Sequence, residues 1–271
     1  MKKSIILLSL FLMMALVISA IGCAGREAPT PIPTPTATPT PFQSAESILH
    51  EIEARVSGIR GLSQKTEIEP EFLTKQELKA YLDKDFTENN PAEELRTEKA
   101  ELVMLDLLPP DYDLPTRLLE LSEEQVIGFY DDKTNEMVVL GNLNQIGPAE
   151  KVTFAHEYDH ALENQSFNLQ SLPLHDKDNS DLAMAALSVA EGDATLVMTL
   201  YAYQYLSPTE IKELAQSTEG KNTAFDSAPP VIRETLLFPY VQGTEFTMSI
   251  FILGGWKAVN QLYIDVPKST E

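Results

Sequence analysis

The sequence predicts a mostly helical α+β protein, and three observations support this fold class. From residue 44 onward, apolar residues recur at spacings of three and four over most of the chain, as on the buried face of a helix. Residues 126–140 are instead rich in β-branched and aromatic residues. The order is helices, then strands, then helices, which does not alternate as a parallel α/β fold would.

The first part of the folded region contains only helical signals. Residues 44–62 place Ile48, Ile52 and Val56 on one helical face. A second helix is expected at residues 74–82, where Thr74 and Glu77 form a capping box at its start. A third is expected at 92–108, where two prolines end it, and a fourth at 114–120. We expect residues 43–122 to form an N-terminal helical subdomain without recognisable chemistry of its own.

A β-hairpin begins the second part, residues 123–271. Two β-rich runs, 126–130 and 137–140, flank a polar turn. After it, Pro148 suits the first turn of a helix that continues to Phe167. A long apolar helix is expected at 180–206, another begins at the capping box of 207–210, and the helical region beyond 230 is interrupted by Gly254-Gly255.

The composition excludes several classes of function. Forty-one acidic residues against twenty basic ones give a formal net charge of −21, which repels the phosphate backbone of nucleic acids. The chain has one cysteine, so an intramolecular disulfide and a cysteine-rich metal site are excluded.

The N-terminus is typical of an exported protein. Lys2 and Lys3 precede an apolar run over residues 5–21, which ends in Ala20-Ile21-Gly22-Cys23. This ending resembles the lipobox of bacterial lipoproteins, which implies a signal peptide at 1–22 and lipidation of Cys23. An uncleaved signal anchor is the alternative, because the run is almost long enough to span a bilayer. In both cases the protein is extracytoplasmic and held at the membrane.

Residues 23–42 are expected to form a tether. Six prolines lie within residues 29–41, alternating with threonine, and such a segment favours extended polyproline II. At about 3.1 Å per residue it would hold the folded part roughly 40 Å from the membrane.

His156, Glu157 and His160 form an H-E-x-x-H motif in the helix that begins at Pro148. Residues four apart lie on one helical face, so both imidazoles can reach one ion while Glu157 lies beside it. Zinc held in this way needs a third protein ligand and an open position for water. A metal-polarised water could then lose its proton to Glu157 as general base.

Glu191 is the expected third ligand. Glu191 and Asp193 are the two charged residues between Leu182 and Leu206, and a carboxylate in so apolar a helix costs several kcal/mol unless it is paired or binds metal. The alternative is that Glu191 is only a carboxylate at the N-terminus of a helix that restarts at Gly192. Asp193 is expected to orient a ligand imidazole. A metzincin would need glycine and histidine where this chain has Glu163 and Ser166.

The pattern resembles the gluzincin branch of zinc metallopeptidases. The resemblance implies that His156, His160 and Glu191 bind one zinc ion and that Glu157 is the general base. It also implies that a hairpin strand borders the substrate cleft beside the active-site helix. The chain is similar over roughly residues 45–271 to an uncharacterised group of bacterial lipoprotein zincins, in these segments: 128–131, 155–162, 190–195, 238–240 and 254–256. Asp159 departs from that pattern, and the group would continue beyond Glu271, so we expect a C-terminal piece to be missing.

The expected function is a membrane-tethered zinc peptidase of the cell envelope that acts on peptide or protein substrates. One alternative is a catalytically inactive zincin-like lipoprotein that binds a peptide or a polymer, and another is a metal that only clamps two helices together. The residue that stabilises the oxyanion is not assigned among four tyrosines, Tyr201, Tyr203, Tyr205 and Tyr240. The oligomeric state is left open.

Overall fold

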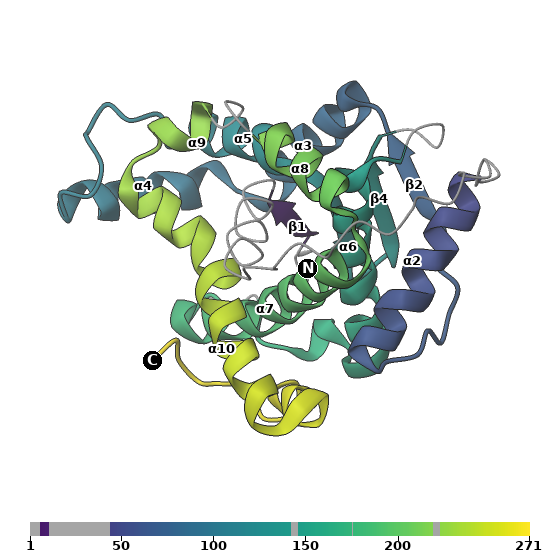
Figure 1. Cartoon of the computed structure of the whole chain (residues 1–271). Helices are drawn as coiled ribbons and strands as arrows, with labels where there is room; N and C mark the ends of the chain where they lie inside the picture. Colours follow the sequence, from purple (N-terminus) through teal and green to yellow (C-terminus); the bar gives the residue numbers. More distant parts are fainter. Residues whose placement is uncertain (1–5, 11–43, 142–145, 175, 219–222) are drawn as a thin grey trace, which may run out of the picture.

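A computed structural model describes residues 6–10, 44–141, 146–174, 176–218 and 223–271, which are mostly helical with one small sheet (Figure 1). The expected α+β class is therefore confirmed at this level. The elements in chain order are β1 (Ile6–Leu10), α2 (Ala45–Arg60), β2 (Pro70–Leu73), α3 (Lys75–Asn89), α4 (Ala92–Met104), α5 (Leu114–Gln125), β3 (Val126–Asp131), β4 (Glu136–Leu140), α6 (Pro148–Phe167), the 3₁₀ helix η1 (Leu169–Ser171), α7 (Ser180–Tyr205), α8 (Pro208–Thr218), α9 (Thr223–Ser227) and α10 (Pro230–Leu262).

The sheet has the strand order β1-β3-β4-β2. Strands β3 and β4 form the expected antiparallel hairpin, in which Gly128 lies opposite Val139. Strand β2 pairs in parallel with β4, with Phe72 also opposite Val139, and the sequence did not predict it. A four-residue strand that begins at a proline and pairs with a distant partner carries almost no local signal.

Strand β1 comes from the segment expected to be a signal peptide. It pairs antiparallel with β3, with Leu8 opposite Phe129. Removal of residues 1–22 would leave β3 as an edge strand of the sheet, and that cleavage remains a prediction. Cys23 and the tether of residues 23–42 lie outside the described residues.

The helical boundaries mostly follow the local signals. Helix α3 begins with the predicted capping box, in which Glu77 N–H donates to the Thr74 hydroxyl and Glu77 accepts from Thr74 N–H. Helix α5 continues to Gln125, five residues beyond the predicted end. Helix α4 ends at Met104 rather than at residue 108, because the chain turns there through Asp106, whose φ is 59°.

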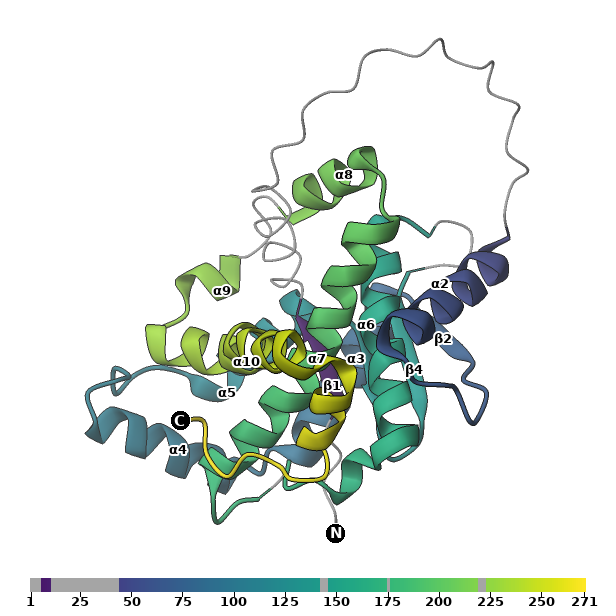
Figure 2. The ribbon, with the colours of Figure 1, turned by 60° about the horizontal axis from the view of Figure 1, so that its bottom comes forward.

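The core lies where α6 packs between the sheet and two other helices, α2 and α7 (Figures 1 and 2). One face of the sheet, including Tyr130 and Val139, contacts α6, while the other face, including Phe129 and Val138, contacts α3. Helix α2 contributes Ile52 and Val56 to the core of α6 and α7. The core therefore draws on both sides of the boundary placed at residue 122.

Helices α7 and α10 cross at two glycines. A Cβ atom on Gly192 would lie 2.3 Å from the backbone of Gly243, and one on Gly243 would lie 2.4 Å from the carbonyl oxygen of Ser188. Only glycine permits this approach, which brings α10 against α7 one residue from Glu191. Further along, Gly255 (φ 62°) kinks α10 at the interruption that the sequence predicted.

Among the described residues, α7 and α10 are long and apolar enough to cross a membrane by length and composition alone. For α7, 72% of the most apolar window is buried within the protein, as in the core helix of a soluble domain, whereas for α10 the share is 22%. The exposed surface of α10 includes Ile252 and Leu253.

Candidate metal centre

Helix α6 carries the motif through the centre of the molecule. It starts where the Glu150 carboxylate accepts from the backbone N–H of Gly147 at 2.9 Å, with Pro148 in the first turn, and ends at Asn168 in a left-handed conformation (φ 57°). The predicted helix is therefore confirmed. Its residues from Val152 to Glu163 are all buried, because the sheet and the helices α2 and α7 cover it on different sides.

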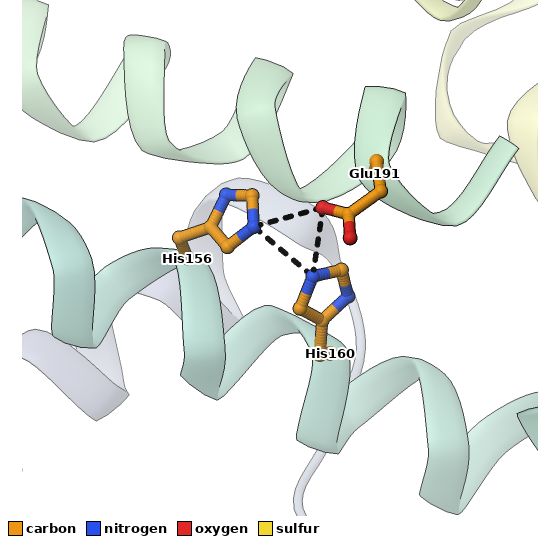
Figure 3. A group of neighbouring side chains, drawn as sticks. All are labelled: His156, His160 and Glu191. Carbon is orange, nitrogen blue, oxygen red and sulfur yellow. Dashed lines mark hydrogen bonds and ion pairs between the residues drawn. The ribbon is translucent and has the colours of Figure 1, made fainter. Parts of the chain in front are cut away.

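The structure brings together the three residues that the sequence singled out as ligands. His156 and His160 project from α6 toward Glu191 on the neighbouring α7 (Figure 3). Glu191 Oε2 lies 3.2 Å from His156 Nε2 and 3.3 Å from His160 Nε2, and the two Nε2 atoms are 3.0 Å apart. All three side chains are buried, and together they form a group that can bind a metal ion.

The size of this triangle fits a tetrahedral ion. Ligand atoms about 2.0–2.1 Å from a tetrahedral metal are about 3.3–3.4 Å from each other. The three observed separations, 3.0–3.3 Å, are close to that edge length. Three donor atoms thus form one face of a tetrahedron and leave a fourth corner without a ligand from this set.

The electrostatics of the group favour a cation. Burial opposes ionisation of Glu191, but the adjacent His160 and His156 outweigh it and lower the pKa of Glu191 to about 2. Burial lowers the pKa of His156. For His160 burial acts in the same direction, yet the charges of Glu163 and Glu191 raise its pKa well above the ordinary value. The carboxylate of Glu191 is thus held in its charged form beside two imidazoles, as a cation site requires.

Glu157 lies beside the group, in a tight contact between α6 and β3. It is fully buried, and a Cβ atom on Gly128 would be 3.6 Å from its Cγ and 2.7 Å from Thr153 Cγ2. A glycine at position 128 therefore lets the strand approach the helix at the turn that carries Glu157.

Tyr240 on α10 also reaches the group. Its hydroxyl donates to Glu191 Oε1 at 3.1 Å, and its ring centroid is 6.5 Å from that of His156. Burial, followed by the charge of Glu191, raises the pKa of Tyr240 well above the ordinary value, so the phenol keeps its proton. Of the other tyrosines considered, Tyr201 lies in the core and Tyr203 and Tyr205 are exposed.

Glu163, not Asp193, is the carboxylate that contacts an imidazole of the candidate triangle. Glu163 Oε2 lies 3.0 Å from His160 Nδ1, so it accepts from that nitrogen and directs Nε2 toward Glu191. Asp193, for which we expected this role, faces a different partner. It accepts from Arg60 Nε at 2.9 Å and Nη2 at 2.8 Å and from the Tyr263 hydroxyl at 2.9 Å. A residue two positions after Glu191 lies about 200° further around the helix, which explains the difference.

Arg60 was not recognised from the sequence. It is the last residue of α2 and is fully buried, and its guanidinium carbon lies 4.7 Å from the centroid of the Trp256 ring. Burial opposes its charge, but Asp193 and Asp159 raise the pKa of Arg60 further above its ordinary value. Its position was a usable signal, because Ile52, Val56 and Arg60 are spaced by four and share the buried face of α2.

Asp159 completes a group of buried acids with Glu163 and Asp193. Burial, followed by the charges of Asp193 and Glu163, raises the pKa of Asp159 well above its ordinary value. Burial likewise raises the pKa of Glu163 to about 7. Arg60 at the end of α2 and Tyr263 directly after α10 meet the acids of α6 and α7 at this group, which lies on the Nδ1 side of His160.

No protein-family model matches this chain, and comparisons with curated proteins and with solved structures find no similar protein.

Proposed function

We propose that the protein is a zinc-dependent peptidase with a zincin-like, gluzincin-type catalytic site, in which Glu157 is the general base. The observation that carries the proposal is the buried triangle of His156, His160 and Glu191, with atoms 3.0–3.3 Å apart. The support for Glu157 as the base is that it directly follows the first of these residues in α6 and is buried beside them.

The donor set supports zinc in particular. Two imidazole nitrogens and one carboxylate oxygen suit zinc, and sites with three protein ligands are typical of catalytic rather than structural zinc. A bound zinc ion would polarise a water molecule and lower its pKa toward neutrality. The Glu163 carboxylate holds His160 in the tautomer whose Nε2 can donate electrons to the ion.

The remaining steps use side chains of this chain. Glu157 takes the proton of the attacking water and can return it to the leaving amine. Tyr240 keeps its proton, and its hydroxyl, which here donates to Glu191, could turn and donate instead to the oxygen that becomes negative in the transition state. The edge of β3 can pair with an extended peptide beside Glu157, as it does here with residues 6–10.

We place this enzyme on the outer face of the cytoplasmic membrane or in a periplasm. The support is the basic and apolar start of the chain, the lipobox-like sequence ending at Cys23 and the proline-rich tether of residues 23–42. Its substrates would then be peptides or proteins of the cell envelope.

Substitution of Glu157 by glutamine tests the proposal. The Glu157→Gln chain should bind about one zinc ion, as the wild type does, because glutamine keeps the shape of the side chain and no ligand is changed. Peptide hydrolysis should fall by at least about 100-fold, since only the base is lost. Zinc content by elemental analysis and cleavage of a proteome-derived peptide library, read by mass spectrometry, give both quantities.

Glu213→Gln, on the exposed face of α8, is the matched control and should leave both zinc content and cleavage unchanged. Cleavage by Glu157→Gln at the wild-type rate would remove Glu157 from the mechanism. A wild-type chain that binds zinc but cleaves no member of the library would count against the peptidase itself.

A metal that only joins α6 to α7 is the second candidate. The complete burial of both imidazoles favours it, because a structural ion is usually closed off from solvent. In that case zinc removal would lower the melting temperature while wild type and Glu157→Gln were equally inactive. A fourth protein ligand in the zinc-bound protein would also indicate this role.

A further inference from the structure

We propose that Asp159, Glu163 and Asp193 form a second cation site, separate from the zinc ligands, which binds a hard divalent cation of the calcium class. The site uses the same two helices as the zinc ligands but the opposite side of His160. Its occupation does not require that the protein be a peptidase.

The geometry brings three carboxylates to one point. Asp159 and Glu163 are four residues apart on α6, and Asp193 faces them from α7. One oxygen from each lies within 4.8 Å of the others, and all three side chains have no exposed surface. Ligand oxygens around a cation at 2.3–2.6 Å are separated by up to about 5 Å, so the spacing is compatible with a shared ion.

Several oxygens of this group have no hydrogen-bond partner among the described residues. Both carboxylate oxygens of Asp159 are buried and unpartnered, and so is Oε1 of Glu163. An unsatisfied buried charged oxygen is costly, and native proteins rarely keep one without a partner, a water or an ion. Three such atoms in one cluster therefore indicate a ligand.

The charge of the group specifies the ligand further. Three carboxylates carry three negative charges, and Arg60 supplies one positive charge, which it directs mainly at Asp193 through Nε and Nη2. His160 donates from Nδ1 to Glu163 but is neutral when its Nε2 binds a metal. Two negative charges remain, and a divalent cation would balance them.

The donor atoms distinguish between divalent cations. Carboxylate oxygens are hard ligands and suit calcium or magnesium rather than zinc or copper. Magnesium usually retains several waters, which a fully buried group does not favour, whereas calcium accepts six to eight oxygens and bidentate carboxylates. Calcium is therefore the cation we expect.

Calcium binding by the full chain tests the site. The zinc-loaded chain, purified in detergent, is equilibrated with radioactive calcium, and bound calcium is counted after dialysis. We expect one calcium ion per chain beyond the zinc, and a change in the fluorescence of Trp256, the single tryptophan, which stacks on Arg60. Asp159→Asn should lower calcium affinity at least about tenfold while zinc content stays the same.

Asp85→Asn is the matched control, because Asp85 is a partly buried acid on α3, outside the group, and it should leave calcium binding unchanged. Absence of saturable calcium binding by the wild type would overturn the proposal even if Asp159→Asn failed to fold. The proposal would also fail if Asp159→Asn bound calcium as tightly as the wild type. It would fail as well if Asp159→Asn had a higher melting temperature than the wild type while calcium did not change the melting temperature of the wild type. That last result would mean that a proton, not a cation, neutralises Asp159.

Discussion

Two groups of three side chains join the same pair of helices, and they differ in chemistry. The first contains His156, His160 and Glu191, and its two imidazole nitrogens are donors of intermediate softness that suit zinc. The second contains Asp159, Glu163 and Asp193, all oxygen donors, with Arg60 beside them. Both groups are buried, and His160 connects them because its two ring nitrogens face one group each.

This difference shows how one helix can serve two purposes. Residues 156 and 160 are four apart and share one face of α6. Residues 159 and 163 are also four apart and share a second, neighbouring face. The first face supplies the atoms expected to bind and activate, whereas the second supplies two carboxylates, one of which, that of Glu163, holds an imidazole in place. Disturbing each group separately should therefore affect different measurable properties.

The largest effect is expected from removing a nitrogen ligand. His156→Ala deletes one corner of the triangle without touching the acid group, so zinc affinity should fall at least about 1,000-fold and hydrolysis should be lost. Competition with a zinc chelator measures the affinity. His50→Ala, on the exposed surface of α2, is the control. Retention of tight zinc binding by His156→Ala would mean that the triangle is not the metal site.

Removing the arginine should mainly affect folding stability. Arg60→Met keeps an unbranched apolar stem but leaves buried carboxylates without their cation, which should cost about 3–5 kcal/mol of unfolding free energy. Chemical denaturation measures it. Arg96→Met, at an exposed position on α4, should change stability by less than about 0.5 kcal/mol. A loss below about 1 kcal/mol for Arg60→Met would show that Arg60 does not compensate the acids.

The metal-free chain should lose stability as the pH rises. The pKa of Glu163 is raised to about 7 from an ordinary value of 4.5, so the folded chain holds a proton that the unfolded chain has released. This stability is fully present below about pH 4.5 and is lost as the pH rises through 7. The raised pKa of His160 acts in the same direction, whereas the lowered pKa of His156 acts against it. We expect a net loss of stability between pH 5 and pH 8.

Denaturation of the chelator-treated chain at pH 5 and pH 8 measures this loss. Glu163→Gln is the control, because glutamine does not titrate and the difference between the two pH values should shrink. A wild-type stability that increases from pH 5 to pH 8 would contradict the assignment of the raised pKa.

The smallest effects come from two tyrosines on or next to α10, each of which donates to one group. Tyr240→Phe removes the hydrogen bond to Glu191 and should lower kcat about 10- to 100-fold at unchanged zinc content. Tyr263→Phe removes the hydrogen bond to Asp193 and should cost about 1–3 kcal/mol of stability. Parallel kinetics and denaturation of both chains separate the two roles. Equal effects of the two substitutions on kcat would argue against a role for Tyr240 in the transition state.

The nitrogen-containing group was predictable and the acid group was not, for a physical reason. His156, Glu157 and His160 are neighbours on one helix, so their spacing alone indicates that they meet, and Glu191 is conspicuous as a charge in an apolar segment. Arg60 and Asp193 are 133 positions apart, and nothing local links them. The hairpin and most helices follow from periodicity and capping, whereas β2, which pairs with a strand far away in the chain, does not.

For the membrane-tethered protein that we propose, the position of Arg60 determines what proteolytic release would yield. Helix α2 begins at Ala45, just after the proposed tether, and ends with Arg60, which forms an ion pair with Asp193 of the acid group. A proteolytic cut before residue 43 would release a diffusible molecule with both groups complete. A cut after Arg60 would instead remove that support together with the anchor, so release and inactivation would occur in the same event.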